Sequence, residues 1–382
     1  KNIIYRNKAK INDDDIESVV SVLKSDFLTQ GSKVNEFEKK FSEYIGSRFA
    51  VSVSNGTAAL HLCNLALGTC DKSIVITSPI TFCATSNSVL YAGGNVEFCD
   101  INRETFLLDI KKVRDKLESS PKGTYTGIIP VDFAGKAVDL EAYRNLADEF
   151  GLWIIEDSCH APGGFFKDSK GINQKCGNGV YADLSIFSFH PVKHIACGEG
   201  GMITTNNETL YNKLKILRSH GIIKKLNSIK GNKEGWYNEM QSLGYNYRMP
   251  DINCALGISQ LKRAKENIKK RRLIAKKYIE AFENKPIVTP LISEIEEHAF
   301  HLFVIQVNNR KELYNYLKSF NINSQVHYVP VHKMPYYEKK YGKQILPISE
   351  EFYSKCLSLP IYPSLSISDQ EFVIEKVNSF IS

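Results

Sequence analysis

A single lysine stands out in the stretch SFHPVKHIACGEGG, which covers residues 188–201. Lys193 follows an apolar run at 183–189 that is typical of a strand, and it precedes glycines that permit a close backbone approach. An amine held in a crevice at a strand end can form an imine with an aldehyde. The stretch therefore predicts a reactive lysine.

Two more strand ends carry groups that suit the same crevice. In FAVSVSNGTAALHLCNLAL, a β-branched run stops before Gly56 and Thr57, where a helix is expected, and the N-terminus of a helix favours a phosphate. In LWIIEDSCHA, an apolar strand ends at Asp157, where open α/β sheets bind ligands. Each feature also has an alternative interpretation. The turn before Gly56 could serve packing alone, and Asp157 could cap the next segment.

Together the three features match the needs of pyridoxal phosphate (PLP). Its phosphate needs an anchor, its pyridine nitrogen needs a carboxylate that keeps it protonated as an electron sink, and its aldehyde needs an amine. We therefore expect PLP as the cofactor, with the amine from Lys193 and the carboxylate from Asp157.

Histidines and cysteines near Lys193 raise the alternative of a zinc site. His190, His194 and Cys197 have the spacing H-x-x-x-H-x-x-C, which straddles a loop with a lysine and a proline. Zinc sites use closely defined pairs, so we expect no metal. The other residues of this alternative are Cys159, His160 and Cys176.

The first two thirds of the chain alternate short apolar runs with helical patterns. This alternation predicts a largely parallel sheet with helices on both faces. The expected strands are 73–78, 95–100, 127–133, 152–157, 183–189 and 201–206, and the expected helices are 56–67, 84–92, 139–150 and 208–219.

Beyond residue 250 the pattern changes to that of a smaller α+β domain. We expect a large domain at 1–250 and a small one at 251–382. The small domain should contain a long helix after NYRMPD, a strand at 301–307, a helix at 310–320, a strand at 324–329 and a last helix after SISDQE. Residues 226–242 are expected to form a mobile loop.

Composition indicates an ordinary soluble protein of 382 residues, of which 43% are hydrophobic and 24% charged. No run is long enough to span a bilayer, and the first residues lack the apolar core of a signal peptide. Nine cysteines without a C-x-x-C pair suit reduced core residues. We expect a cytoplasmic location and no membrane association.

A basic stretch at 261–278 has two interpretations. Its apolar residues fit one face of a helix whose charges lie in water, which we favour; a nucleic-acid surface is the alternative, but no nucleic-acid motif accompanies the charge. The residues expected on the apolar face are Leu261, Ile268, Leu273, Ile274, Tyr278 and Ile279.

Motifs along almost the whole chain resemble those of the DegT-type sugar-nucleotide aminotransferases. They are FLTQGSKVNEFEKKFSEYIG, SNGTAALHL, SPITFCATSNSVLYAGG, VDFAG, IIEDSCHAPGG, FSFHPVKHIACGEGG, LRSHG and LGYNYRMPDINCALGISQL. The resemblance implies a PLP-dependent transferase of fold type I, an α/β fold whose large domain holds a mostly parallel seven-stranded sheet and whose small C-terminal domain is α+β. Within this family, FSFHPVK, LRSHGI, GYNYRMPD and VHYVP are most similar to aminotransferases of pseudaminic acid biosynthesis.

The resemblance assigns roles around the cofactor. Lys193 would form the Schiff base and carry protons, and Asp157 would pair with the pyridine nitrogen. Gly56 and Thr57 would hold the phosphate through backbone amides, and Ser188 would add a hydroxyl. A plain turn hydroxyl remains the alternative for Ser188.

Other roles implied by the resemblance are less direct. Phe82 would stack on the cofactor ring, with a core aromatic as the alternative, and His160 would lie near the polar edge of the ring. Asn246 would reach the phosphate of the partner subunit in a homodimer, although its neighbouring tyrosines could simply pack an interface. The substrate-facing candidates are Thr29, Gly31, His327, Tyr328 and His332, for each of which a structural role is the alternative.

The activity implied by the resemblance is transfer of an amino group from L-glutamate to a UDP-linked 4-keto-6-deoxy-N-acetylhexose, giving a 4-amino sugar nucleotide and 2-oxoglutarate. Alternatives are another nucleotide-linked keto sugar, of the perosamine type or with a 3-keto group, or a non-catalytic regulatory protein. Sugar dehydratases of this fold carry histidine in place of the lysine, so Lys193 argues against them. The segment 165–183 is longer than the shortest family connections, and its role is unassigned.

Overall fold

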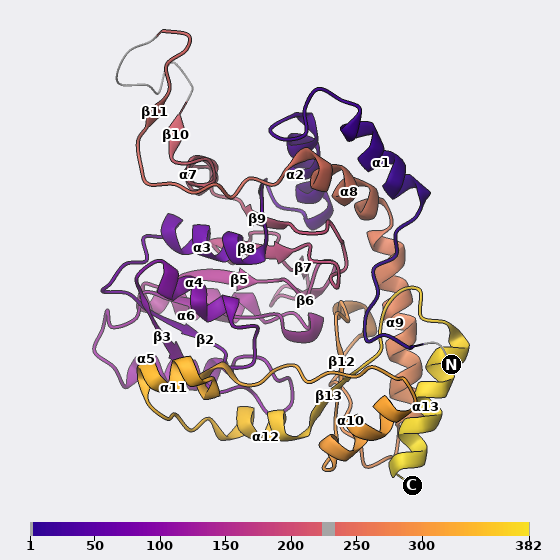
Figure 1. Ribbon diagram of the computed structural model, residues 1–382. Helices are drawn as coiled ribbons and strands as arrows, with labels where there is room; N and C mark the ends of the chain where they lie inside the picture. The colour runs from indigo at the N-terminus through magenta and orange to yellow at the C-terminus, as the bar shows by residue number, and fades with distance from the viewer. Residues whose placement is uncertain (1–2, 224–233, 382) are drawn as a thin grey trace.

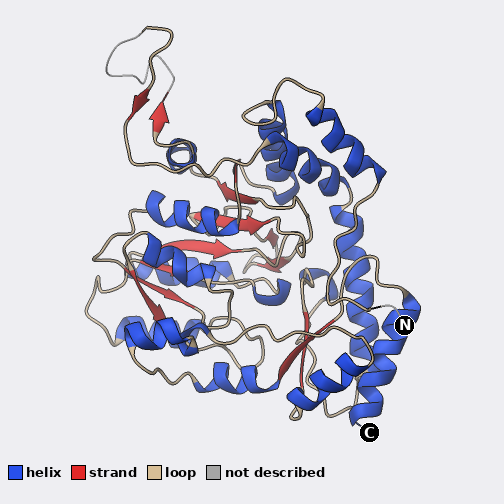
Figure 2. Ribbon diagram, in the orientation of Figure 1, coloured by secondary structure: helices blue, strands red, loops and turns tan. Residues whose placement is uncertain are grey.

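A seven-stranded sheet forms the centre of the computed structural model, which describes residues 3–223 and 234–381 (Figures 1 and 2). The strand order is β1-β9-β8-β5-β4-β2-β3. Strand β9 runs antiparallel to both of its neighbours, whereas β8, β5, β4, β2 and β3 pair in parallel. The mostly parallel α/β sheet predicted from the sequence is therefore confirmed. Its strands are β1 (Phe49–Val53), β2 (Ile74–Thr77), β3 (Asn95–Phe98), β4 (Gly127–Ile129), β5 (Trp153–Asp157), β8 (Leu184–Ser188) and β9 (Gly201–Thr205).

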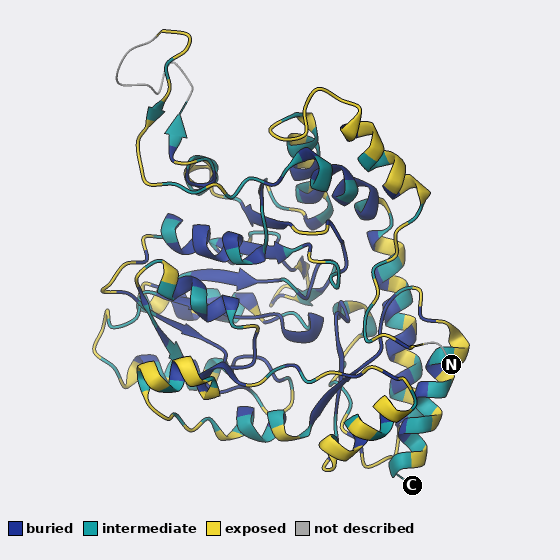
Figure 3. Cartoon of the chain, viewed as in Figure 1, coloured by how far each residue is buried: buried dark blue, intermediate teal, exposed yellow. Residues whose placement is uncertain are grey.

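Helices cover both faces of this sheet because neighbouring strand residues point to opposite sides. Ile76 and Ile128 pack in the cluster that contains side chains of α5 and α6, whereas Val75 and Ile129 pack with α3, α4 and α7. The helices of the sheet domain are α1 (Asp13–Leu23), α2 (Ser32–Ile45), α3 (Gly56–Ala66), α4 (Ala84–Tyr91), α5 (Ile110–Glu118), α6 (Leu140–Phe150) and α7 (Glu208–Arg218). Figure 3 shows the strands between these helices as mostly buried.

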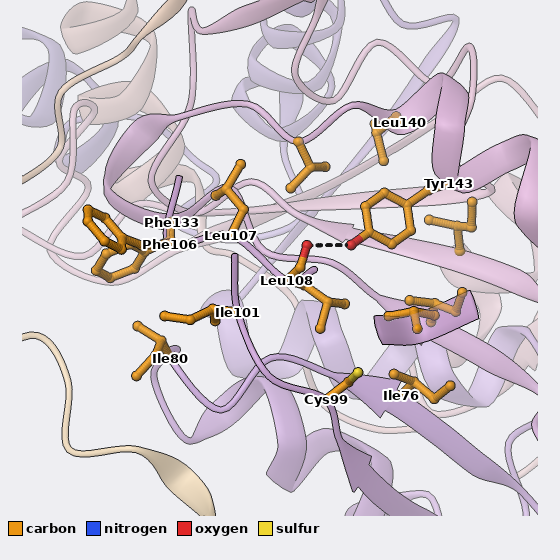
Figure 4. Close-up of a cluster of buried hydrophobic side chains, with 14 of the residues drawn as sticks. Ile76, Ile80, Cys99, Ile101, Phe106, Leu107, Leu108, Phe133, Leu140 and Tyr143 are labelled. Atoms are coloured by element: carbon orange, nitrogen blue, oxygen red, sulfur yellow. Dashed lines mark hydrogen bonds between the residues drawn. The ribbon is translucent and has the colours of Figure 1, made fainter. Parts of the chain in front are cut away.

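One of the two clusters is shown in Figure 4, where Ile76, Leu107 and Tyr143 fill the space below α6. The Tyr143 hydroxyl donates a hydrogen bond to the carbonyl oxygen of Leu108 at 2.8 Å, so its buried polar group is satisfied. Fully burying an aliphatic side chain of this kind contributes about 1.5–3 kcal/mol to stability. This packing holds the β4 and β5 ends in place.

A second core lies among the C-terminal elements and includes Ile4 from the N-terminal segment. The elements after the sheet are α8 (Asp251–Lys262), α9 (Ala264–Ala281), β12 (Phe303–Gln306), α10 (Arg310–Ser319), α11 (Pro335–Tyr341), α12 (Pro347–Lys355), β13 (Cys356–Leu359) and α13 (Ile367–Ile381). Helix α8 packs on α1 and α2 rather than on this core. The division of the chain at residue 250 remains a prediction.

Several connections matter for the site. The loop 189–200 joins the end of β8 to the start of its neighbour β9, so both ends of the loop lie together where Ser188 pairs with Gly201. The long segment 165–183 contains a hairpin of β6 (Phe165–Lys167) and β7 (Asn173–Lys175). Strands β10 (Ile222–Ile223) and β11 (Glu239–Met240) pair in an arm that projects from the body (Figure 1). The predicted mobile loop at 226–242 lies partly outside the described residues.

The structure corrects three expectations for the C-terminal part. Residues 324–329 form no strand beyond an isolated bridge between Gln325 and Ser358, and the partner of β12 is β13 instead. The expected single long helix is divided into α8 and α9 at Arg263. Leu273 does not join the apolar face of α9, since it is 67% exposed, while Arg271 is buried.

Within the described residues, no helix is both long and apolar enough to cross a membrane. All nine cysteines are free. Cys63, Cys99 and Cys254 are among those buried in the core, as expected for reduced residues.

Candidate active site

The first strand of the sheet leads directly into the helix that begins at Gly56. Asn55 caps α3, because its side-chain oxygen accepts a hydrogen bond from the Ala58 N–H at 2.8 Å. Within the described part of the chain, the N–H groups of Gly56 and Thr57 donate to no acceptor. Free N–H groups at a helix N-terminus attract an anion.

Gly56 also lies against the end of β8. A Cβ at this position would be 3.1 Å from Ser188 Cβ, 3.5 Å from Ser188 Oγ and 3.5 Å from Cys159 Sγ. A larger residue would therefore crowd the point where helix and strand meet. The structure brings the predicted phosphate residues Gly56, Thr57 and Ser188 together there, and their role in binding remains a prediction.

Asp157 ends β5 with both carboxylate oxygens held. Thr85 Oγ1 in α4 donates to Oδ2 at 2.8 Å, and the Cys159 N–H donates to Oδ1 at 3.2 Å. Thr81 Oγ1 lies 2.7 Å from Thr85 Oγ1 and extends this chain of hydrogen bonds. The carboxylate is 5% exposed, and it can still accept a hydrogen bond from a cationic ligand.

A pair of buried acids lies behind Asp157. Burial, followed by the charge of Glu156, raises the pKa of Asp132 well above its ordinary value. Burial likewise raises the pKa of Glu156, and the two carboxyl groups share a hydrogen bond, so Asp132 is the protonated member. The Ser158 hydroxyl donates to Asp132 at 2.6 Å, and the Ser185 hydroxyl donates to Glu156 at 2.6 Å.

This pair is also the centre of a grouping that a metal ion could use among the described residues, with Cys176 as the third member. Backbone N–H groups of Val138 and Gly177 and the two serine hydroxyls already bond these carboxyls. The zinc set raised by the sequence is not brought together: His190 is exposed, and the buried His194 ring bonds the Ala299 carbonyl oxygen at 2.8 Å.

Lys193 lies in the loop between β8 and β9. Burial lowers the pKa of its ammonium group; Cys159 and Asp157 act in the opposite direction, and Arg6 acts in the same direction as burial. Burial raises the pKa of the Cys159 thiol well above its ordinary value, so Asp157 is the charge that supports the ammonium. No described residue accepts a hydrogen bond from Lys193 Nζ. The amine is therefore available to a ligand.

His160 and Tyr328 form another part of the candidate site. His160 Nδ1 accepts a hydrogen bond from the Ala134 N–H at 3.2 Å, and its Nε2 lies 3.2 Å from the Tyr328 hydroxyl. Burial is the main cause that lowers the pKa of His160 well below its ordinary value, so the ring is neutral and carries its proton on Nε2. It then donates to Tyr328, which leaves the tyrosine proton free for a ligand.

Phe82 lies beside Tyr328, with ring centroids 6.3 Å apart. Its side chain is 59% exposed, which is unusual for a phenylalanine and leaves the ring open to a ligand. The alternative of a core aromatic is therefore not supported by its surroundings. Stacking on a cofactor ring remains a prediction.

The substrate-side candidates do not form one group. Burial lowers the pKa of His327 to about 3, and the ring lies near Lys193 while its Nδ1 is 2.8 Å from Ser358 Oγ. Gly31 is the N-cap of α2, where its N–H donates to Asp251 Oδ2 at 2.8 Å, and Thr29 is exposed two residues before it. His332 bonds Glu350 of α12 at 3.2 Å and has no contact with the residues around Lys193.

Asn246 stands apart from Lys193 on the same chain. Its backbone bridges to Ser219, and its side chain is exposed with no hydrogen bond to the described residues of this chain. Its neighbours Tyr245 and Tyr247 stack on each other at 5.1 Å, and Tyr247 bonds His61 at 3.1 Å. The tyrosines therefore pack within this chain, and both the role of Asn246 and the alternative of interface packing remain predictions.

The sequence analysis assigned no role in this site to three residues that the structure places there. Thr85 orients Asp157, the Cys159 N–H fixes its other oxygen, and the Arg6 side chain reaches the wall formed by Tyr328. Thr85 lies in ITFCAT at the start of an expected helix, where a polar residue on the sheet side was the available signal. Arg6 had no such signal.

These residues fit pyridoxal phosphate. Gly56, Thr57 and Ser188 would hold its phosphate, Asp157 its pyridinium nitrogen, and Lys193 its aldehyde. When bound, the cofactor supplies an electron sink that no side chain of the site provides. The exposed face of Phe82 and the free N–H groups at α3 are the features that otherwise lack a partner.

Comparisons with known proteins agree with this fit. The model of the DegT/DnrJ/EryC1/StrS aminotransferase family matches residues 9–378. A protein of Campylobacter jejuni subsp. jejuni named UDP-4-amino-4,6-dideoxy-N-acetyl-beta-L-altrosamine transaminase is 39% identical over 379 residues, which cover 97% of this chain and 96% of that protein.

Solved structures of aminotransferases are also similar to this chain. Helicobacter pylori PseC, described as an aminotransferase involved in the biosynthesis of pseudoaminic acid, matches with a TM-score of 0.90 and 30% identity over 100% of this chain and 99% of that one. A putative sugar aminotransferase from Streptococcus pneumoniae in its PLP-form matches with a TM-score of 0.87 and 26% identity over 99% and 98%. The chain therefore belongs to the DegT/DnrJ/EryC1/StrS aminotransferase family and is a PLP-dependent aminotransferase.

Proposed function

We propose that the protein transfers an amino group from L-glutamate to the ketone of a nucleotide-linked 4-keto sugar. The observation that carries this proposal is the unbonded Lys193 amine, on which the charge of Asp157 acts, in a chain that belongs to an aminotransferase family. The products would be a 4-amino sugar nucleotide and 2-oxoglutarate.

Each side chain has a task in this reaction. Lys193 Nζ would take the proton from the α-carbon of glutamate in the first half and deliver a proton to the sugar carbon that bore the ketone in the second. Asp157 would hold a positive charge at its fixed oxygens throughout. Tyr328, kept as a donor by neutral His160, would orient an acceptor atom at the reacting ring.

The expected acceptor is UDP-2-acetamido-2,6-dideoxy-4-keto-hexose. Support comes from the relatives in Campylobacter jejuni and Helicobacter pylori, whose names refer to an altrosamine transaminase and to pseudoaminic acid biosynthesis. A perosamine-type or 3-keto sugar nucleotide is the second candidate, because the site residues that would read the sugar are the least defined. We expect such a product to enter the biosynthesis of pseudaminic acid or of another sugar of cell-surface polysaccharides.

We further propose a homodimer with shared sites, located in the cytoplasm. Asn246 is exposed, and so are the apolar side chains of Trp236, Met240 and Leu243, which belong to the projecting arm or follow it (Figure 1). Exposed apolar groups gathered on one region favour a protein partner. Nine free cysteines suit a reducing compartment. Neither nucleic acid nor a membrane is expected as a partner.

The test is to incubate the purified holoenzyme with L-glutamate and a panel of nucleotide-linked keto sugars, and to detect the amino sugar and 2-oxoglutarate by mass spectrometry. A 4-keto UDP sugar should give both products in equal amounts. The matched control is Lys193→Ala, which should give neither. Turnover of a 3-keto sugar in preference would select the second candidate, and no product from any keto sugar would overturn the proposal.

A further inference from the structure

An arginine near the N-terminus is held beside the reactive lysine without a partner of its own. Arg6 Nη1 is buried and bonds no described residue. The backbone around it is fixed, since the Arg6 carbonyl oxygen accepts from the Ile361 N–H at 3.0 Å and the Asn7 side chain donates to the Val192 carbonyl oxygen at 2.6 Å. Arg6 is therefore held between the C-terminal core and the loop of Lys193.

The surroundings of Arg6 have more positive charge than negative. Its positive charge acts on Lys193, His327 and Tyr328, and it lowers the pKa of all three. His327 is neutral because burial lowers its pKa to about 3, and Asp157 is the acidic group whose charge acts on Lys193 and Tyr328. Arg6 is half-buried, and its Nη1 is buried without a partner among the described residues; burying part of an unpaired charged group is costly, so an anion bound there would stabilise this region.

Arg271 provides an internal comparison. It is also buried, and burial lowers its pKa to about 9. Its Nη1 donates to the carbonyl oxygens of Phe300 at 3.1 Å and Ile361 at 3.0 Å, so that nitrogen needs no ligand. Arg6 Nη1 has no such carbonyl. Arg271 therefore has protein partners for Nη1, although its Nε has none among the described residues, whereas Nη1 of Arg6 has no described partner.

We propose that Arg6 binds the α-carboxylate of the amino donor, an inference that rests on the proposed function. A guanidinium offers a planar fork of N–H groups that matches a carboxylate. In an amino acid the α-carboxylate is attached to the same carbon as the amine that must replace the Lys193 amine. A cation beside Lys193 is therefore correctly placed to hold it.

The diphosphate of the sugar nucleotide is the other anion that enters such a site. It is separated from the reacting ketone by the whole sugar ring, so it lies farther from Lys193 than an α-carboxylate does. The arrangement of Arg6 beside Lys193 favours the carboxylate, and an experiment can separate the two sources.

The experiment measures binding of glutarate to the holoenzyme by calorimetry, because this dicarboxylate lacks an amine and cannot react. Arg6→Gln should weaken glutarate at least about tenfold, and Arg6→Lys should fall between Arg6→Gln and the parent. Lys8→Gln is the matched control, since Lys8 is an exposed cation of the same segment above the Tyr5 ring; it should change the affinity less than about twofold.

Two further measurements make the result decisive. UDP affinity should be the same in Arg6→Gln and in the parent. In the parent, the α-amide of L-glutamate should bind much more weakly than L-glutamate in a competition experiment. In Arg6→Gln, the amide should compete nearly as well as L-glutamate itself. Equal thermal unfolding midpoints of Arg6→Lys and parent would show that the fold is retained.

The inference is overturned if Arg6→Gln binds glutarate like the parent, or if it loses UDP affinity instead. These outcomes differ from a failure of the proposed function. If the parent enzyme aminates a keto sugar and Arg6→Gln has the same KM for glutamate as the parent, only the role of Arg6 is wrong. If the parent aminates no keto sugar, the proposed function itself is wrong.

Discussion

Thr85 Oγ1 donates a hydrogen bond to Asp157 Oδ2 at 2.8 Å, and this contact joins the first turn of α4 to the end of β5. The second carboxylate oxygen accepts from the Cys159 N–H at 3.2 Å. With both oxygens fixed, the carboxylate has one orientation in which to meet a cationic ring nitrogen. The orientation of the charge, and not only its presence, is built into the fold.

Thr85→Val should slow turnover by roughly tenfold while the cofactor stays bound, because it keeps the shape of the side chain and removes its hydroxyl donor. The measurement is kcat for the amino transfer beside the visible absorbance of the bound cofactor. Thr85→Ser retains the hydroxyl and is the control, which should stay close to the parent. A valine variant with the kcat of the parent would mean that Cys159 alone orients the carboxylate.

Asp157→Asn should retain the cofactor but lose activity by orders of magnitude, because a neutral amide does not stabilise a protonated pyridine nitrogen. Single-turnover reaction with L-glutamate, followed at the cofactor absorbance, isolates the proton-transfer step. If this variant reacts as fast as the parent, Asp157 acts only as a structural cap and the ring nitrogen is held elsewhere.

Lys193→Ala should abolish both turnover and the visible absorbance of the lysine-bound cofactor. No other described lysine has its amine beside Asp157. Lys193→Arg, which keeps the charge and cannot form the imine, should be equally inactive. Retention of the spectrum in either variant would remove Lys193 from the centre of the reaction.

The Asp132→Asn variant should gain free energy of unfolding relative to the parent as the pH increases. Asp132 has a folded pKa raised well above the ordinary value of 3.8 by burial, so it stays protonated in the fold while it ionises in the unfolded chain. The parent therefore loses stability as the pH rises from the unfolded pKa towards the folded one. Asparagine does not ionise in either state, and its amide can donate to Glu156 as the protonated acid does.

Denaturant unfolding at about pH 4 and about pH 7 measures this difference. The free energy of unfolding of the variant minus that of the parent should grow between the two values. Asp26→Asn, at an exposed carboxylate, is the control and should show little change. A difference that is constant with pH would mean that Asp132 is ionised in the folded protein.

Mixing inactive Lys193→Ala chains with inactive Asn246→Ala chains should restore activity, because one site of each heterodimer would combine an intact lysine with an intact asparagine. The Asn246 side chain bonds no described residue of its own chain, which leaves it free for a partner. Subunit exchange is verified by mass spectrometry. With exchange shown and both parents inactive, a mixture without activity would remove Asn246 from a shared site.

Much of the sheet was predictable because a buried strand between two helical layers leaves a continuous apolar run in the sequence. Strand ends then locate Asp157 and Gly56 without knowledge of their contacts. The two-stranded sheet of β12 and β13 was harder to predict. The run at 324–329 alternates like a strand, yet β12 pairs with Cys356–Leu359, whose CLSL pattern is short and follows a helix without a turn signal.

Helix α9 shows the limit of periodicity in another way. Leu273 and Ile274 are adjacent, so they cannot both lie at the centre of one helical face, and the backbone places Leu273 in water. Arg271 takes a buried position because carbonyl oxygens from Phe300 and Ile361 converge on it. Such partners come from distant parts of the chain, and a local pattern cannot reveal them. Arg6 was missed for the same reason.

The antiparallel return from β8 to β9 has a kinetic consequence. Because Phe189 N–H bonds the Gly200 carbonyl oxygen at 2.8 Å and Cys197 N–H bonds that of Phe189 at 2.9 Å, the loop is closed on itself as well as anchored at both ends. Its amine is thereby kept at a high effective concentration next to the reacting carbon. Resetting Lys193 then involves rotation of its side chain while the hydrogen-bonded backbone of the loop stays in place. Recovery of the lysine between the two halves of a cycle therefore requires no refolding of this loop.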